Sequence, residues 1–330
     1  MRIASLLPSA TEILFAIGAG RDVVGVTHEC DYPPAVMALP RLTSSAIGHE
    51  GRTCADIDRH IRRAVHAGSS LYRLDERLLG KLRPDLIVTQ ELCAVCAVSY
   101  QTVARAARRL AGAVPVLSLE PATLDGIMAT VVATGAATGH EREAGRLVAG
   151  MRARIDAVGS LAAPAARPRV ACLEWTSPAM AGGHWVPELV RLAGGDDPLG
   201  QVGEPSRAVG CDEIAAAAPD IVVFMPCGFH LARTREVTAE VTEHPGFGQL
   251  PAARTGRVAA VDGSSYFSRP GPRIVGGLEI LAAIIRAEPG GPLPAGAAWV
   301  PLAQCSGPRP GALGTGDLPG ARHRAEPAGG

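Results

Sequence analysis

Thiol and imidazole groups, which bind transition metals readily, are grouped in short stretches of this sequence. Cys93 and Cys96 form a Cys-x-x-Cys pair, the spacing of a redox thiol pair or of half a zinc site. His28 and Cys30 flank a glutamate, and His184 stands in a Gly-Gly-His-Trp run. We take these residues as candidate metal ligands. The plainer alternative is that the thiols are small packed side chains and the histidines are solvated.

Aromatic residues are scarce, at 4% of the chain, so the position of each one is informative. Several stand near the histidines and cysteines, beside a few polar groups. Flat aromatic faces with such neighbours suit a large, partly apolar ligand. The candidate ligand-binding residues are Tyr32, Trp175, Trp185, Phe229, Tyr266, Phe267 and Arg269. Ordinary packing is the alternative for the tryptophans, and helix capping or ion pairing is the alternative for the arginine.

Strand-like apolar runs come just before most of these candidates. They cover residues 3–7, 23–26, 85–89, 114–119, 169–173, 221–225 and 257–261. Helical patterns alternate with them, which predicts parallel sheets with helices on both faces. Ligands of such sheets bind outside the carboxyl ends of the strands, so we expect the candidates to line one cleft.

Residues 123–158 have apolar side chains at three- and four-residue spacing, the pattern of an amphipathic helix. An unbroken helix of this length would be on the order of 50 Å long, more than one small sheet can cover. We therefore predict a long rigid linker helix that braces two lobes. Gly135 and Gly139 are the positions where it could bend or split.

The predicted fold class is α/β, with two parallel-sheet lobes joined by the linker helix and a ligand cleft between the lobes. The N-terminal lobe covers residues 1–122, the linker helix 123–158 and the C-terminal lobe 159–287. Residues 288–330 include 18 Gly or Pro among 43 residues and show no apolar periodicity. Such a composition buries too little surface to offset its chain entropy, which predicts a disordered tail.

The composition excludes several classes of protein. Lys plus Arg and Asp plus Glu both number 32, which leaves no basic excess for nucleic acid or an anionic membrane. No apolar run reaches the roughly 18 residues of a membrane span, so we expect a chain that is not membrane-embedded. Signatures of common enzymes, such as Gly-x-Ser-x-Gly, a Walker loop and His-Glu-x-x-His, are absent from the sequence, which favours a binding protein over an enzyme.

The start of the chain bears on its compartment. Its first apolar run is interrupted by Ser5 and Pro8, as in a strand and its loop rather than in a secretory signal. The eight cysteines are scattered rather than dense, which is typical of reduced thiols. We expect a cytoplasmic protein, or a periplasmic or extracellular one if the start truncates a signal peptide.

Several motifs together carry a family resemblance. The opening Arg-Ile-Ala-Ser-Leu-Leu-Pro-Ser-Ala-Thr-Glu over residues 2–12 resembles the start of the iron-siderophore and cobalamin solute-binding proteins of ABC importers. Residues 25–34, with their Asp-Tyr-Pro-Pro, are similar to the next stretch of the cobalamin-binding members. Residues 84–88, the long helix and Arg-Pro-Gly-Pro-Arg-Ile at 269–274 complete the resemblance, which covers about residues 1–287.

The resemblance implies two α/β lobes with little hinge motion, cobalamin as the bound ligand and an ABC permease as a possible partner. It implies that Tyr32 lines the cleft and that Arg269 contacts the ligand. The sequence departs from the pattern in two places. The tryptophan that cobalamin binders carry shortly after Asp-Tyr-Pro is not found around residues 43–48, and the Cys/His loops are unusual for an importer.

Three functions are therefore compatible with the sequence. The first is corrinoid binding in the cleft, for uptake or intracellular trafficking. The second is binding of another metal chelate, such as haem or a siderophore complex. The third is a metal- or thiol-dependent enzyme that uses the Cys/His loops. Under the first, His184 or a thiolate of Cys93 or Cys96 is predicted to coordinate the metal of the ligand directly.

Overall fold

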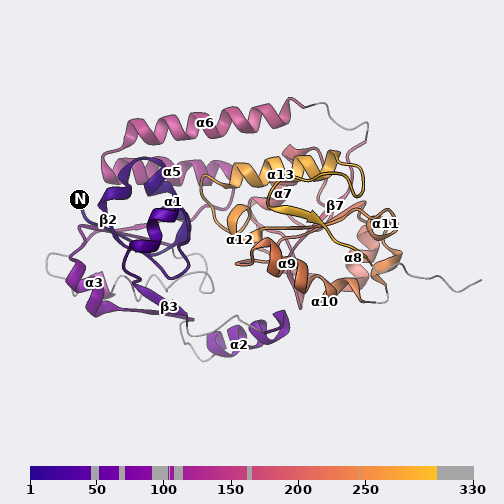
Figure 1. Ribbon diagram of the computed structural model, residues 1–330, viewed down its shortest axis with the longest axis horizontal. Coiled ribbons are helices and arrows are strands. Elements are labelled where there is room, and N and C mark those ends of the chain that lie inside the picture. Colours follow the sequence, from indigo (N-terminus) through magenta and orange to yellow (C-terminus); the bar gives the residue numbers. More distant parts are fainter. Residues whose placement is uncertain are drawn as a thin grey trace, which may run out of the picture.

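The computed structural model describes residues 1–45, 52–66, 71–90, 103, 105–107, 114–161, 166–244 and 246–302. Two α/β lobes lie side by side, with a pair of long helices running along one edge of both (Figure 1). The two-lobed α/β fold predicted from the sequence is confirmed.

The sheet of the N-terminal lobe has four parallel strands in the order β2-β1-β5-β6. They are β1 (Ile3–Ser5), β2 (Val23–Gly25), β5 (Leu86–Thr89) and β6 (Val116–Ser118). Central strands β1 and β5 are buried throughout, because helices cover both faces of a parallel sheet. Around this sheet lie α1 (Pro8–Ala16), η1 (Ala19–Asp22), η2 (Pro34–Ala38), α3 (Glu76–Leu82) and the small antiparallel pair β3 (Thr43–Ser45) and β4 (Tyr72–Leu74).

The C-terminal lobe has a six-stranded sheet in the order β12-β11-β10-β7-β8-β9. Its parallel centre consists of β7 (Val170–Thr176), β10 (Ile221–Phe224) and β11 (Val258–Val261). The antiparallel edges are β8 (Ala179–Ala181), β9 (Arg207–Ala208) and β12 (Ala297–Trp299). The helices are α7 (Val186–Ala193), α8 (Cys211–Ala217), α9 (Leu231–Val237), α10 (Ala239–Thr242), η3 (Phe247–Gln249), α11 (Pro251–Arg254), α12 (Gly263–Tyr266) and α13 (Ile274–Arg286).

The linker predicted as one helix over 123–158 is instead a hairpin of α5 (Leu124–Thr138) and α6 (Glu141–Gly159). Gly139 ends α5 in the left-handed conformation, at φ +70°, where glycine has no steric cost. At Gly135 an added Cβ would come within 2.5 Å of the Ala144 Cβ, so a glycine there lets the two helices pack closely. The prediction of a single helix was therefore wrong, because the chain reverses at Gly139 while the apolar spacing continues into α6.

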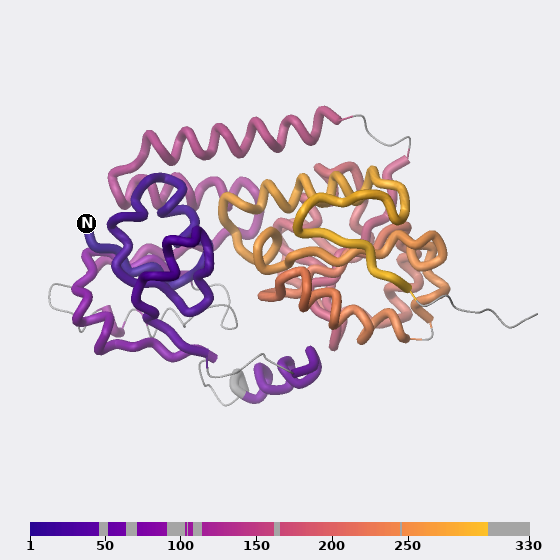
Figure 2. The backbone as a smooth tube through the Cα atoms, in the orientation of Figure 1, coloured from indigo at the N-terminus to yellow at the C-terminus, as the bar shows by residue number. Residues whose placement is uncertain are grey.

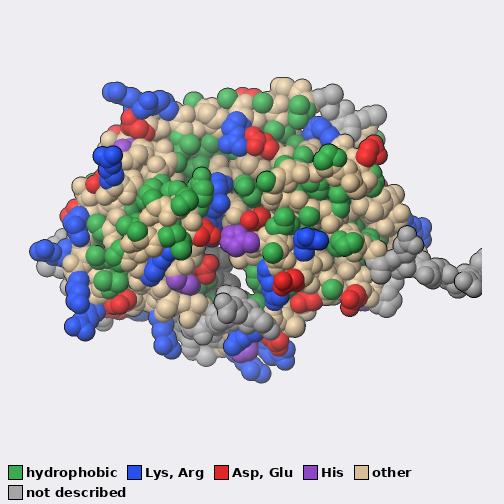
Figure 3. Space-filling view, in the orientation of Figure 1, with side chains coloured by type: hydrophobic (Ala, Val, Ile, Leu, Met, Phe, Trp, Pro, Cys, Tyr) green, Lys and Arg blue, Asp and Glu red, His purple; other side chains and the backbone are tan. Residues whose placement is uncertain are grey.

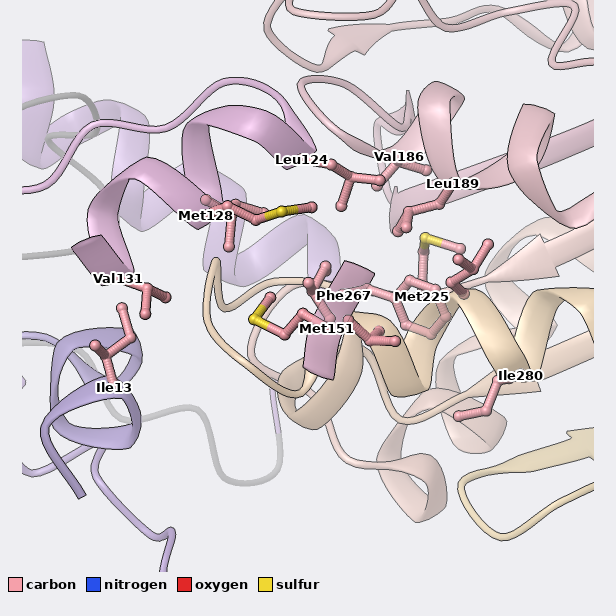
Figure 4. Close-up of a cluster of buried hydrophobic side chains, with 14 of the residues drawn as sticks. Ile13, Leu124, Met128, Val131, Met151, Val186, Leu189, Met225, Phe267 and Ile280 are labelled. Carbon is pink, nitrogen blue, oxygen red and sulfur yellow. The ribbon is translucent and has the colours of Figure 1, made fainter. Parts of the chain in front are cut away.

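This hairpin contacts both lobes. At the first turn of α5, the Leu124 N–H donates to the Glu188 carboxylate of α7 over 3.0 Å. Arg154 of α6 donates to both carboxylate oxygens of Glu279 on α13, at 2.8 and 2.7 Å. Figure 4 shows Val131 of α5 facing Ile13 of α1 in the other lobe. One hydrophobic cluster therefore runs from the N-terminal lobe through the hairpin into the C-terminal lobe.

The prediction that residues 288–330 form a disordered tail is wrong for the first part of that range. Residues 288–302 are ordered, and β12 extends the C-terminal sheet by pairing with β11. The Trp299 indole N–H donates to the Gly291 carbonyl over 2.8 Å, and the Val300 N–H donates to the Val258 carbonyl over 2.8 Å. An open sheet edge orders a short strand through main-chain hydrogen bonds, which do not require apolar periodicity. Residues 303–330 lie outside the described residues.

Among the described residues, no helix has both the length and the apolar character needed to cross a membrane.

Candidate functional site

Loops at the carboxyl ends of the strands meet where the two lobes adjoin. Charged side chains of both signs and a histidine gather there on the face shown in Figure 3, above an opening between the lobes. Five side chains that form ion pairs across this junction make up what we call the interlobe clasp: Glu12 and Asp31 from the N-terminal lobe, with His230, Arg269 and Arg273 from the C-terminal lobe.

Arg269 is at the centre of the clasp. Its guanidinium donates to both carboxylate oxygens of Asp31 and to the Glu29 carbonyl, the last over 3.1 Å. Glu12 receives a weaker contact from it at 3.4 Å. Partial burial works against ionisation of Asp31, but the hydrogen bonds and charge of Arg269 outweigh it and hold the pKa of Asp31 below its ordinary value. The arginine predicted to contact a ligand is thus already bound by carboxylates of the other lobe.

Glu12 forms the second half of the clasp. Its side chain is only 2% exposed, and both of its oxygens accept hydrogen bonds from Arg273, at 2.9 and 2.5 Å. A buried carboxylate is tolerated only when it is paired and hydrogen-bonded, and here two arginines supply that pairing. Arg273 therefore has a fixed position between the lobes.

Arg273 also holds two of the predicted ligand-binding aromatics. Its guanidinium carbon lies 4.4 Å from the centroid of the Tyr32 ring and 6.0 Å from that of Tyr266, within the range of cation–π attraction. Tyr32 nevertheless remains 46% exposed, whereas most large apolar side chains are buried. The structure therefore brings Tyr32, Tyr266 and Arg269 together at the lobe junction, with a Tyr32 ring that is open to a ligand.

Trp175 and Phe229 lie outside the clasp, where they pack against helix α2 (Cys54–His66). Their ring centroids are 5.4 Å apart, and Cys54 and Ile57 of α2 pack against this part of the C-terminal lobe. The Cys54 N–H donates to the Glu240 carboxylate of α10 over 3.1 Å, and burial raises the pKa of the Cys54 thiol to about 11. Figures 1 and 2 show α2 beneath the gap between the lobes. Trp175 and Phe229 thus contact a helix of the N-terminal half of the chain.

Trp185 and Phe267 contact each other in the C-terminal lobe, next to its hydrophobic core. The Trp185 indole N–H donates to the Phe267 carbonyl over 2.9 Å, which fixes the half-buried ring. Phe267 is 1% exposed and lies among core residues such as Met151 and Met225 (Figure 4). Phe267, directly after α12, therefore belongs to the core, and contact of its side chain with a ligand stays a prediction.

Of the candidate metal ligands, those within the described residues are His28, Cys30 and His184, and they do not form one cluster. The His28 ring contacts the Thr43 hydroxyl through Nδ1 at 2.7 Å and Glu29 through Nε2 at 3.3 Å. Cys30 is buried, with its thiol between the hydroxyls of Thr11 and Thr27, and burial raises its pKa. Both therefore have local partners in the N-terminal lobe.

His184 belongs to the other lobe, where its ring lies 5.6 Å from that of Trp185 and burial lowers its pKa. Cys93 and Cys96 lie outside the described residues. Among the residues that are described, no group of three or more His, Cys, Asp or Glu side chains is placed to hold a metal ion. Direct coordination of a ligand's metal by His184, Cys93 or Cys96 stays a prediction.

A buried acid in the C-terminal lobe gives a pH-dependent prediction. Glu174 of β7 accepts a hydrogen bond from the Ser206 hydroxyl, and burial, with the nearby charge of Asp197, raises the pKa of Glu174 to about 7. A carboxyl whose folded pKa exceeds its ordinary value of 4.5 stabilises the fold below pH 4.5, and this contribution is lost as the pH rises to 7. We expect Glu174→Gln, which cannot ionise, to be more stable than the wild type at pH 8 by on the order of 2 kcal/mol.

Thermal melts at pH 5 and pH 8 measure this effect. The gain in Tm should be much smaller at pH 5, where Glu174 is already largely protonated. Glu204→Gln, at an exposed position, is the matched control and should change little at either pH. An equal gain for Glu174→Gln at both pH values would mean that Glu174 does not titrate in this range.

Sequence reasoning missed Glu12 and α2 as parts of the junction, and it missed the ion pairs that Asp31 and His230 make there. Glu12 and Asp31 stand within motifs already singled out, Pro-Ser-Ala-Thr-Glu and Asp-Tyr-Pro. The signal that could have identified Glu12 and Asp31 is an acidic residue within a motif at the carboxyl end of a strand. The docking of α2 on the other lobe had no such signal.

Known proteins share the fold described above. A family model described as periplasmic binding protein matches residues 3–264. No curated protein matches the chain. A possible iron-binding (periplasmic solute-binding) protein from Staphylococcus epidermidis superposes with a TM-score of 0.67 at 24% identity, covering 87% of this chain and 98% of that one.

Two further structures bind named chelates. The periplasmic heme-binding protein RhuT from Roseiflexus sp. RS-1 has a TM-score of 0.64 at 25% identity, over 86% of this chain and 97% of that one. The periplasmic vitamin B12 binding protein BtuF of Vibrio cholerae has a TM-score of 0.60 at 20% identity, over 86% and 96%. At these identities the likeness establishes a shared fold, which extends over nearly the whole of each relative.

Proposed function

Because this chain belongs to the periplasmic binding protein family, we propose that it is a non-catalytic binder of a metal chelate, held where its two lobes meet. We propose further that the chelate is a corrinoid such as cobalamin, bound for uptake or for trafficking inside the cell. The proposal gives the protein a small-molecule ligand and, in the uptake case, an ABC permease as partner. The cytoplasmic location expected from the sequence stays a prediction.

The observation that carries the proposal is the exposed ring of Tyr32 at the lobe junction. Arg273 holds this ring against the C-terminal lobe, and Glu12 holds Arg273, so an aromatic face is ready before a ligand arrives. A rigid aromatic surface suits a flat macrocycle, since little side-chain freedom is lost on binding. Tyr32 stands in the Asp-Tyr-Pro segment that resembles cobalamin-binding proteins.

Similar structures include binders of vitamin B12 and of heme, and each of these ligands holds its metal in a tetrapyrrole-type ring. The shared core across the α5–α6 hairpin supports a receptor whose lobes move little relative to each other. Haem remains the second candidate, because several similar structures are described as heme-binding proteins.

Titration of the full-length protein with hydroxocobalamin, followed by visible spectroscopy and calorimetry, tests the proposal. We expect binding, and we expect Tyr32→Ala to weaken it by about 1–3 kcal/mol, or roughly 5- to 150-fold. Tyr32→Phe keeps the ring and is the matched control, with an affinity near that of the wild type. Binding of hemin without binding of cobalamin would overturn the corrinoid assignment. Unchanged affinity in Tyr32→Ala would overturn the placement of the site.

A further inference from the structure

The charge of the lobe junction bears on which chelates it accepts. Asp262 accepts hydrogen bonds from the Ser265 backbone and side chain and lies 3.1 Å from His230, so it adds a third carboxylate to the surroundings of the clasp. Two of these carboxylates, Glu12 and Asp31, are paired with Arg269 and Arg273, and the third, Asp262, joins the group through His230. In this group the carboxylates outnumber the arginines by one.

The sequence extends the same pattern around the carboxyl ends of the strands. Residues 27–34, 119–122, 226–230 and 262–268 contain acids in three of the four segments and no lysine or arginine in any. Arg41, just beyond the first of them, donates to the backbone carbonyls of Thr27 and Cys30 within its own lobe. Among the described residues, the arginines that form ion pairs across this junction are Arg269 and Arg273, and carboxylates already neutralise both. Arg233 also reaches the N-terminal half of the chain, where it donates to the Arg52 carbonyl beside α2, and it is paired with Glu236.

Metal chelates differ in the charge at their rim. Haem presents ionised propionates, and many ferric siderophores carry carboxylates or catecholates. The corrin ring of cobalamin is rimmed by amide groups, which are uncharged. An anionic rim at this junction would have to face carboxylates or to draw an arginine out of a buried pair, and both are unfavourable.

We propose that the interlobe clasp is a specificity device: by occupying both junction arginines with Glu12 and Asp31, it selects chelates with an uncharged, amide-type rim against chelates that present ionised carboxylates. This inference rests on the proposed function, because it concerns the same site. Arg269 and Arg273 are here positioning residues that hold the lobes and the Tyr32 ring.

The test compares cyanocobalamin with its monocarboxylate, in which one rim amide is hydrolysed to a carboxylate of nearly the same shape. Calorimetry on the wild-type protein should give at least about 10-fold weaker binding for the monocarboxylate. Asp31→Asn removes one clasp charge and leaves Arg269 partly unpaired, so the ratio of the two affinities should fall several-fold. Asp262→Asn should shift the ratio in the same direction without removing an arginine partner.

Asp156→Asn on the exposed side of α6 is the matched control, because it makes the same change in net charge away from the junction. Its affinity ratio should equal that of the wild type. Thermal melts confirm that each variant is folded, and Asp262→Asn serves if Asp31→Asn is not. Equal binding of the amide and the carboxylate by the wild type would overturn the charge selection and leave corrinoid binding intact. Failure to bind either corrinoid would overturn the proposed function itself.

Discussion

Replacing Glu12 with alanine is expected to lower the free energy of unfolding by about 3–5 kcal/mol, the usual cost of breaking a buried ion pair from one side. The Glu12 carboxylate is almost fully enclosed and accepts hydrogen bonds from Arg273 and Arg269 of the other lobe. Removing it leaves two largely buried guanidinium groups at the junction with fewer hydrogen-bond acceptors. Urea denaturation of the full-length protein measures the change.

A double-mutant cycle separates the pair from the rest of the fold. Arg273→Ala removes the arginine that depends most on Glu12, so the double variant Glu12→Ala/Arg273→Ala should lose less stability than the sum of the single variants. Glu141→Ala, at an exposed position in the first turn of α6, is the control and should cost less than about 1 kcal/mol. Additive losses in the cycle would show that the two residues act independently and that the clasp adds no coupling.

Ending the chain after Ala287 is expected to lower Tm by about 8 °C or more, compared with ending it after Leu302. The shorter chain loses β12, which leaves β11 as an open edge and removes the buried Val300 and the half-buried Trp299 from the C-terminal lobe. Burial of two such side chains contributes roughly 4 kcal/mol, and each kcal/mol shifts Tm by about 2–4 °C in a domain of this size.

Comparing two truncations isolates residues 288–302, because both lack everything beyond Leu302. Differential scanning fluorimetry of the two proteins is sufficient, and Trp299→Ala in the full-length chain should produce part of the same loss. Identical melting of both truncations would mean that β12 contributes nothing to the stability of the C-terminal lobe.

The strands were predictable because they are short apolar runs between turn residues, and parallel strands buried on both faces look that way in any sequence. The hairpin was only half predictable. Apolar spacing continues from α5 into α6, and Gly139 marked the break without showing that the chain reverses there. β12 was not predictable from composition, since its pairing depends on a free edge of a sheet formed elsewhere in the chain.

In the candidate site, too, some residues were predictable from the sequence and others were not. Tyr32 and Arg269 were identified because each stands in a motif at the end of a strand. Their partners were not identified, because Glu12 and Asp31 are 238–261 residues away from the arginines that bind them. Side-chain pairing over such separations depends on how the lobes dock, and no local pattern encodes that docking.

The hairpin has a consequence for synthesis on the ribosome. The backbone N–H of Leu124, at the start of α5, donates to the carboxylate of Glu188, which is synthesised 64 residues later. Apolar side chains of α5 such as Met128 share a core with α7, which contains Glu188, and with α13, which emerges later still. The nascent N-terminal lobe therefore displays an uncovered apolar stripe until Arg286, the last residue of α13, has left the exit tunnel. Vectorial folding of this chain is completed late, and during that interval the α5–α6 hairpin is the surface that a chaperone would recognise.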